Sequence, residues 1–159
     1  MDAKQYWQEY LASQVESQAS DAIYAVDQFG DSPDLAEELA QLVRSQIKTA
    51  TCSALWEWET AGEALPEPGS KMVVLDGKGQ PCCIIEITEV SIRAFNQVDA
   101  QFAYDEGEGD RSLASWRREH WKYFSRVLPQ IGKAPSQTML LVCERFQVIY
   151  QKDSIETID

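Results

Sequence analysis

Residues 72–92 read MVVLDGKGQPCCIIEITEVSI, and this stretch decides the fold. Its first part, Met72 to Leu75, is apolar, and its last part, Cys82 to Ile92, alternates so that successive side chains fall on two faces. The four residues between them, DGKG at 76–79, carry two glycines of the kind that close a tight turn between antiparallel strands. The stretch therefore predicts a β-hairpin.

Outward from this hairpin, helical and extended patterns follow one another. Helices are predicted over residues 3–17, 33–43, 53–58, 98–106 and 112–128, and extended segments over 22–26, 48–52 and 139–150. Ser32 is a good cap for the second helix, because Pro33 then takes its first position. Helices mixed with a hairpin and late strands indicate an α+β fold, whose strands we expect to close into a small barrel or curved sheet.

The N-terminal helix has Trp7, Tyr10, Leu11 and Val15 on one side. We interpret residues 1–20 as a packing or dimerisation helix and residues 21–159 as a single domain. A homodimer is therefore a further expectation.

Composition excludes several classes of protein. The chain has 159 residues, a formal net charge of −12 and 44 % apolar residues, which suffices for a core. No apolar run reaches the roughly 18 residues of a membrane span, and the start does not read as a signal peptide, so a cytoplasmic protein is expected. The four cysteines lack metal-ligand spacing and are interpreted as buried thiols. The strong acidity disfavours binding to duplex DNA.

Two regions could carry chemistry. Residues 104–112, YDEGEGDRS, crowd four carboxylates into one loop, which suits acid/base work but also suits simple helix capping. Lys48 follows a helix and is close to three hydroxyl residues, so it could act as a base or hold an oxyanion, or be an ordinary surface lysine.

His120, the only histidine, lies on an apolar stripe and is interpreted as a packed, hydrogen-bonded core residue rather than a catalytic one. The helix that carries it also carries a basic flank that could hold phosphate groups or merely be solvated: Arg117, Arg118, Lys122 and Arg126.

Three blocks together are similar to the bacterial ASCH-domain family: KTATCSALW at 48–56, EGEGDRSL at 106–113 with Trp116 and His120, and VCERF at 142–146. The resemblance runs from about residue 34 to residue 150. It implies a PUA-like fold, a small β-barrel with flanking helices, and a cleft beneath the lysine segment. The family often has a glycine that ends the helix before the lysine, where this chain has Gln46.

The resemblance also implies action on RNA or a modified nucleoside. No metal or cofactor is expected, because the sequence itself offers no metal site or nucleotide-binding loop. Some members hydrolyse the amide of N4-acetylcytidine with a lysine, a threonine three residues later and a glutamate; others cut single-stranded RNA. These positions fall on Lys48, Thr51 and either Glu108 or Glu106. For binding of substrate or RNA, the expected residues are Trp56, Arg111, Ser112, Arg117 and Arg118.

Two functions stay open at this level. One is hydrolysis of a nucleoside amide, and the other is an RNA-binding module without catalysis, or a ribonuclease. In either case we expect Lys48 to lie in an exposed cleft, so that its removal leaves stability nearly unchanged.

Overall fold

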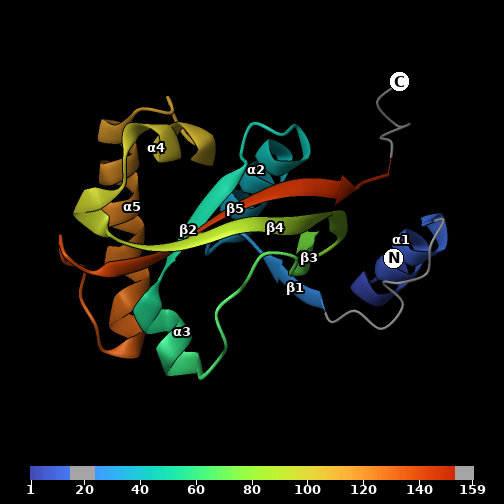
Figure 1. Cartoon of the computed structure of the whole chain (residues 1–159), viewed down its shortest axis with the longest axis horizontal. Helices are drawn as coiled ribbons and strands as arrows, with labels where there is room; N and C mark the ends of the chain where they lie inside the picture. Colours follow the sequence, from blue (N-terminus) through green and yellow to red (C-terminus); the bar gives the residue numbers. More distant parts are fainter. Residues whose placement is uncertain (15–23, 153–159) are drawn as a thin grey trace.

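The computed structural model describes residues 1–14 and 24–152, and within them one five-stranded sheet organises the chain (Figure 1). Its strands, in spatial order, are β1 (Tyr24–Gln28), β3 (Lys71–Leu75), β4 (Pro81–Ala94), β5 (Leu140–Tyr150) and β2 (Ala50–Ala54). β1 pairs with β3 in parallel, and the other three pairs are antiparallel. The predicted hairpin is confirmed as β3 and β4.

The sheet curves into a half-barrel because its central strand is long and irregular. β4 has 14 residues, and its pairing with β5 shifts register between Ile84 and Ile85 and again between Ile87 and Glu89. Such bulges bend a strand and increase its twist. The predicted α+β class with a barrel-like sheet is therefore correct.

Helices pack around this sheet. They are α1 (Ala3–Ser13), α2 (Pro33–Arg44), α3 (Leu55–Ala61), α4 (Ala100–Glu106) and α5 (Leu113–Val127), with short 3-10 turns at Phe95–Gln97 and Leu128–Ile131. In Figure 1, α4 and α5 lie at one end of the sheet and α1 lies at the other. None of the helices within residues 1–14 and 24–152 is long and apolar enough to cross a membrane.

Two apolar clusters hold the helices to the sheet near the site. Val43 of α2 packs with Ile85, Ile87 and Phe146 of the strands. A separate cluster joins α4 and α5, through side chains such as Phe124, to Ala50, Ala54 and Leu141 of β2 and β5. The edge strand β2 is thereby fixed beside α5, and the segment that precedes it is fixed as well.

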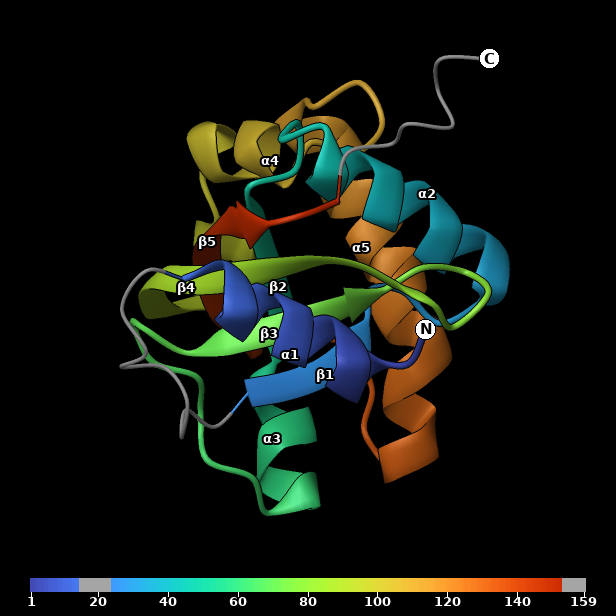
Figure 2. The same ribbon diagram turned by 90° about the vertical axis from the view of Figure 1, so that its right-hand side faces the viewer.

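The N-terminal helix packs on its own sheet, lying across β1 and β3 in Figure 2. Tyr6, Trp7 and Tyr10 are buried against Val73 and Ile84. α1 ends at Ser13, so the predicted end at residue 17 falls outside the described residues. Within residues 1–14 the helix packs on the sheet, while the predicted bounds 1–20 and dimerisation stay predictions.

Candidate active site

The site begins at the end of α2. Ser32 caps the helix start as predicted, accepting from the Leu35 amide. At the other end the amides of Gln46 and Ile47 bond back to Val43 and Leu42, which is the usual pattern of a glycine-ended helix. Here Gln46 takes the left-handed conformation itself, with φ +64°. The helix therefore stops without the expected glycine, and the chain turns so that Lys48 enters the protein interior.

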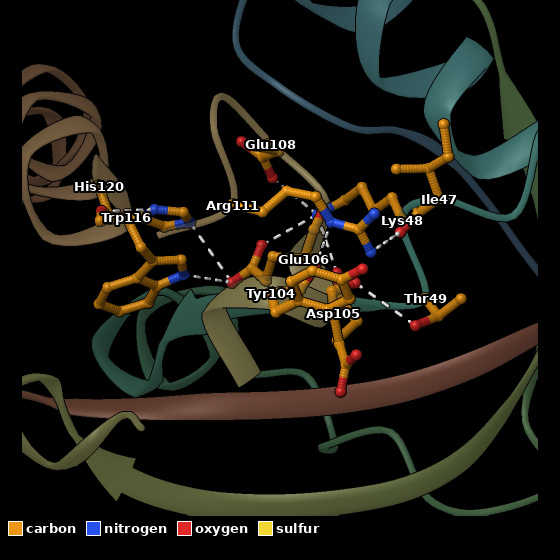
Figure 3. A network of polar contacts seen from close by, with 11 residues as sticks. Ile47, Lys48, Thr49, Tyr104, Asp105, Glu106, Glu108, Arg111, Trp116 and His120 are labelled. Carbon is orange, nitrogen blue, oxygen red and sulfur yellow. Dashed lines mark hydrogen bonds and ion pairs between the residues drawn. The ribbon is translucent and has the colours of Figure 1, made fainter. Parts of the chain in front are cut away.

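Lys48 lies at the centre of a buried polar network (Figure 3). Its Nζ atom donates to the Ala50 carbonyl oxygen at 2.9 Å, to Glu106 Oε1 at 2.9 Å and to Glu108 Oε2 at 2.7 Å. An ammonium group has three N–H donors, so these short contacts occupy all of them. The expectation of an exposed cleft lysine is wrong, because the Lys48 side chain is only 1 % exposed.

The second oxygen of Glu106 faces α5. Glu106 Oε2 accepts from Trp116 Nε1 at 2.9 Å and lies 3.4 Å from His120 Nε2. Glu106 is 1 % exposed, whereas Glu108 is 27 % exposed. Of the two predicted glutamates, one therefore belongs to the buried interior and the other to the rim.

These contacts fix the charges of the pair. Burial alone would lower the pKa of Lys48, but the charges of Glu106 and Glu108 outweigh burial and raise that pKa above its usual value. Burial would likewise raise the pKa of Glu106, yet Lys48 and His120 outweigh it and hold the pKa well below its usual range. Lys48 is therefore a cation and Glu106 an anion at neutral pH.

His120 is confirmed as a packed, hydrogen-bonded residue, but it also joins the network. Its ring stacks on Trp116 at 4.3 Å, and its Nδ1 atom lies 3.0 Å from the Trp116 carbonyl oxygen. Both ring nitrogens thus face acceptors, an arrangement that only the doubly protonated ring satisfies. Burial opposes this charge, but Glu106 outweighs burial and raises the pKa of His120.

The acidic loop after α4 is pressed against the lysine segment. Gly107, with φ +73°, lies so close that a Cβ atom there would be 2.6 Å from the Ile47 carbonyl oxygen. Arg111 adds a clamp: its guanidinium lies 3.6 Å from the Tyr104 ring centroid, and its Nε donates to the Tyr104 carbonyl at 2.9 Å. Arg145, on β5, forms an ion pair with Asp105, with Nη1 and Oδ2 2.6 Å apart.

A pocket of about 540 Å³ opens over this network. It lies between α2 and α5 and includes Lys48, Thr51, Cys52, Glu106 and Glu108 among its lining residues. This volume lies within the range of about 300–1,000 Å³ that is typical of small-molecule sites. The predicted residues Lys48, Thr51, Glu106 and Glu108 thus line one cavity, although up to 60 residues of sequence separate them.

The residues expected to bind RNA are placed elsewhere or are already engaged. Trp56 packs against the apolar cluster of α5, and Ser112 caps that helix by accepting from Ser115 at 3.1 Å. Arg111 is the loop clamp, and Arg117 is exposed outside the pocket lining. Arg118 lines the pocket but pairs with Glu119 at 3.2 Å.

Cys52, Glu106 and His120 place three candidate metal ligands within 4.8 Å of one another. Both Glu106 oxygens already accept from buried donors, and a cation bound there would lie beside the Lys48 ammonium. Burial also raises the pKa of the Cys52 thiol well above its usual value. These three side chains are therefore suited to carrying protons and not to binding a metal ion. The sequence alone did not indicate that Cys52 lies beside Glu106 and His120, because the spacing of these three residues does not match a metal-binding motif.

The protein is thus an α+β domain with a half-barrel sheet and a buried lysine–glutamate pair beneath a pocket. The ASCH domain family model matches residues 25–150, and the chain belongs to this family, which is associated with RNA-related functions. The chain is similar to the crystal structure of the ASCH domain from Lactobacillus crispatus, with 36 % identity, a TM-score of 0.87, and coverage of 93 % of this chain and 94 % of that one.

It is also similar to protein EF3133 from Enterococcus faecalis, with 34 % identity, a TM-score of 0.83, and coverage of 97 % and 91 %. A comparison with curated proteins found no match.

Proposed function

We propose that this protein hydrolyses the amide of an uncharged modified nucleoside of the N4-acetylcytidine type. The observation that carries the proposal is the pairing of charges in the pocket. Among the described residues, every cation that lines it already contacts a carboxylate: Lys48 with Glu106 and Glu108, His120 with Glu106, Arg118 with Glu119, and Arg126 with Asp31.

A phosphate group binds where cations are free to meet it. The pocket offers paired cations and has further acids, Glu38 and Asp110, in its lining. An RNA strand or a nucleotide would have to displace carboxylates and face those two acids. A nucleoside without phosphate meets neither obstacle, so the charge pattern favours it.

Thr51 supports hydrolysis by a covalent route. Its side chain lines the pocket, and within the described residues its hydroxyl has no hydrogen-bond partner, so it is free to meet a ligand. The ammonium of Lys48 binds the carbonyl of the preceding residue, Ala50. All three N–H groups of Lys48 are engaged, so the ammonium can stabilise the oxyanion that forms when the hydroxyl attacks an amide carbonyl only if that oxygen replaces a present acceptor, of which Glu108 at the rim is the most exposed.

The glutamates then have separate roles. Glu106 holds the Lys48 charge in the interior, and Glu108 orients the same ammonium from the rim. Lys48 itself is poorly suited to accept a proton, because it is already charged and its donors are satisfied. We therefore assign the role of accepting the Thr51 proton to a carboxylate.

The test is incubation of the purified protein with N4-acetylcytidine, with cytidine and acetate measured by chromatography. Thr51→Val should reduce kcat by a factor of about 10² to 10⁴, the range for groups of this kind. Thr88→Val, at an exposed position on β4, is the matched control and should leave turnover unchanged. Full activity in Thr51→Val would contradict the covalent route, and no turnover by the wild type would contradict the substrate.

The rival function, RNA binding or cleavage, has one feature in its favour. Arg117, Arg118 and Lys122 are exposed along α5, although Glu119 pairs with two of them. Salt distinguishes the two functions. Binding that depends on several phosphate contacts weakens steeply between about 50 and 200 mM salt, whereas turnover of a neutral nucleoside should change little.

A further inference from the structure

Thr51 has a carboxylate as its cross-strand neighbour. In the antiparallel ladder of β2 and β5, Thr51 lies directly opposite Glu144, just as Cys52 lies opposite Cys143. Directly opposed residues project from the same face, with Cβ atoms about 4.5–5.5 Å apart. No register shift interrupts this part of the ladder. Thr51 and Glu144 are therefore cross-strand neighbours on one face of the sheet, although within the described residues no hydrogen bond joins their side chains and Glu144 does not line the pocket.

Glu144 is buried but is not engaged. Only 7 % of the residue is exposed, yet none of its contacts within the described residues is a hydrogen bond or an ion pair. Every fully buried side-chain nitrogen or oxygen in that part of the chain has a partner. The Glu144 oxygens must therefore keep a small accessible surface. Glu106, in contrast, is saturated by Lys48 and Trp116.

The surroundings of Glu144 leave it a weak acid. Burial raises its pKa to about 7, with Lys48 lowering the pKa and Glu106 raising it. On its other side, β4 places the apolar Val90 opposite it. A proton acceptor works best when its pKa is near the working pH, because it is then both available and basic enough.

We propose that Glu144 is a further catalytic residue, the group that accepts the proton of Thr51. This rests on the proposed amide hydrolysis. The Thr51 oxygen bonds to the acyl carbon while its proton passes to Glu144, and the Lys48 charge stabilises the oxyanion. The C–N bond then breaks, and the proton on Glu144 passes to the leaving nitrogen. In the second half, water attacks the acyl–threonine ester, Glu144 takes the proton of the water and returns it to Thr51, and the carboxylic acid leaves.

The decisive variant is Glu144→Gln, which keeps the size of the side chain and removes its basicity. Its matched control is Glu86→Gln, a half-buried carboxylate on β4 whose cross-strand neighbours are Lys71 and Gln147 rather than Thr51. With N4-acetylcytidine, kcat should fall by about 10² to 10⁴ in Glu144→Gln, with KM little changed. The rise of wild-type kcat/KM through about pH 7 should disappear. Glu144→Asp should restore part of the rate.

A second probe does not depend on the natural substrate. p-Nitrophenyl acetate transfers its acetyl group to a reactive hydroxyl and releases p-nitrophenol, and peptide mass spectrometry locates the acetyl group. We expect acetylation of Thr51 to be faster at pH 8 than at pH 6 and to slow by at least about tenfold in Glu144→Gln. Glu86→Gln should match the wild type.

The two assays separate the two proposals. Acetylation of Thr51 that depends on Glu144, without turnover of the nucleoside, would uphold the role of Glu144 and reject the substrate. Turnover that Glu144→Gln retains with the same pH profile would overturn the role of Glu144 and leave the function standing. Equal acetylation of Thr51 in the wild type and in Glu144→Gln, or no acetylation in either protein, would also overturn the role of Glu144.

Discussion

Gly107 lies directly against Ile47, so that the acidic loop and the lysine segment touch backbone to backbone. A Cβ atom at position 107 would be 2.6 Å from the Ile47 carbonyl oxygen and 2.9 Å from the Lys48 amide nitrogen. The residue also has φ +73°, which any side chain disfavours. This contact sets how closely Glu106 and Glu108 approach Lys48.

Gly107→Ala should therefore be more harmful than an ordinary glycine substitution. We expect the free energy of unfolding to fall by about 3 kcal/mol, through left-handed strain plus displacement of the lysine segment. Gly62→Ala is the matched control, because Gly62 has φ +68° but nothing within 4 Å of its Cβ position. It should cost only about 1 kcal/mol. Urea denaturation measures both, and equal losses would mean that the contact with Ile47 is unimportant.

The two glutamates should differ in their effect on stability. Glu106→Gln leaves Lys48 and His120 without the fully buried anion that balances them, which we expect to cost about 3–5 kcal/mol. Glu108→Gln, at the 27 % exposed rim, should cost about 1 kcal/mol or less. Lys48→Ala should lower the free energy of unfolding by an amount similar to Glu106→Gln, because it leaves the carboxylates of Glu106 and Glu108 without their cation.

Denaturation by urea at pH 7 measures these differences, with Glu119→Gln on the exposed side of α5 as a variant that should not move the transition. Similar losses in Glu106→Gln and Glu108→Gln would show that burial does not govern the strength of the network.

The parts of the fold that could be predicted are those with local causes. The hairpin follows from alternation around a glycine turn, and the start of α2 follows from Ser32 and Pro33. The parallel pairing of β1 with β3 could not be predicted, because it joins Tyr24 to Lys71 across two intervening helices and a strand.

The site shows the same limit. The family resemblance points to Lys48, Thr51 and a glutamate, but the burial of Lys48 depends on Glu106, 58 residues away in sequence. Glu144 reads as one more acid on a strand until the ladder places it opposite Thr51. The positions of Glu106 and Glu144 depend on contacts between residues far apart in the sequence, which hydrophobic periodicity does not reveal.

Gln46 offers a test of how α2 ends. It holds a left-handed conformation that glycine adopts without strain, so Gln46→Gly should raise the free energy of unfolding by about 1 kcal/mol. Gln46→Ala keeps the strain and should bring no gain. Thermal unfolding compares the two variants, and a loss of stability in Gln46→Gly would mean that the glutamine side chain contributes more than its backbone costs.

The last prediction concerns the dependence of stability on pH. Glu144 keeps its proton to about pH 7 in the folded protein, whereas an unfolded glutamate loses it near about pH 4.3. The folded state therefore binds more protons between these values, and this contribution to stability is lost as pH rises through about 7. His120, whose pKa is also raised, contributes stability below about pH 6.5 that is lost as pH rises through its folded pKa. Glu106, with its lowered pKa, acts the opposite way, but only below about pH 4.

Between about pH 6 and pH 8.5, Glu144 alone should lower the free energy of unfolding by about 1 kcal/mol. Glu144→Gln carries no charge at either pH, so it should remove that part of the slope and be more stable than the wild type at pH 8.5. Glu86→Gln should retain the wild-type slope. Urea titrations at a series of pH values measure the difference. If Glu144→Gln and the wild type lose stability in parallel across this range, the Glu144 carboxyl ionises like an ordinary exposed glutamate, and its place beside Thr51 gives it no special acidity.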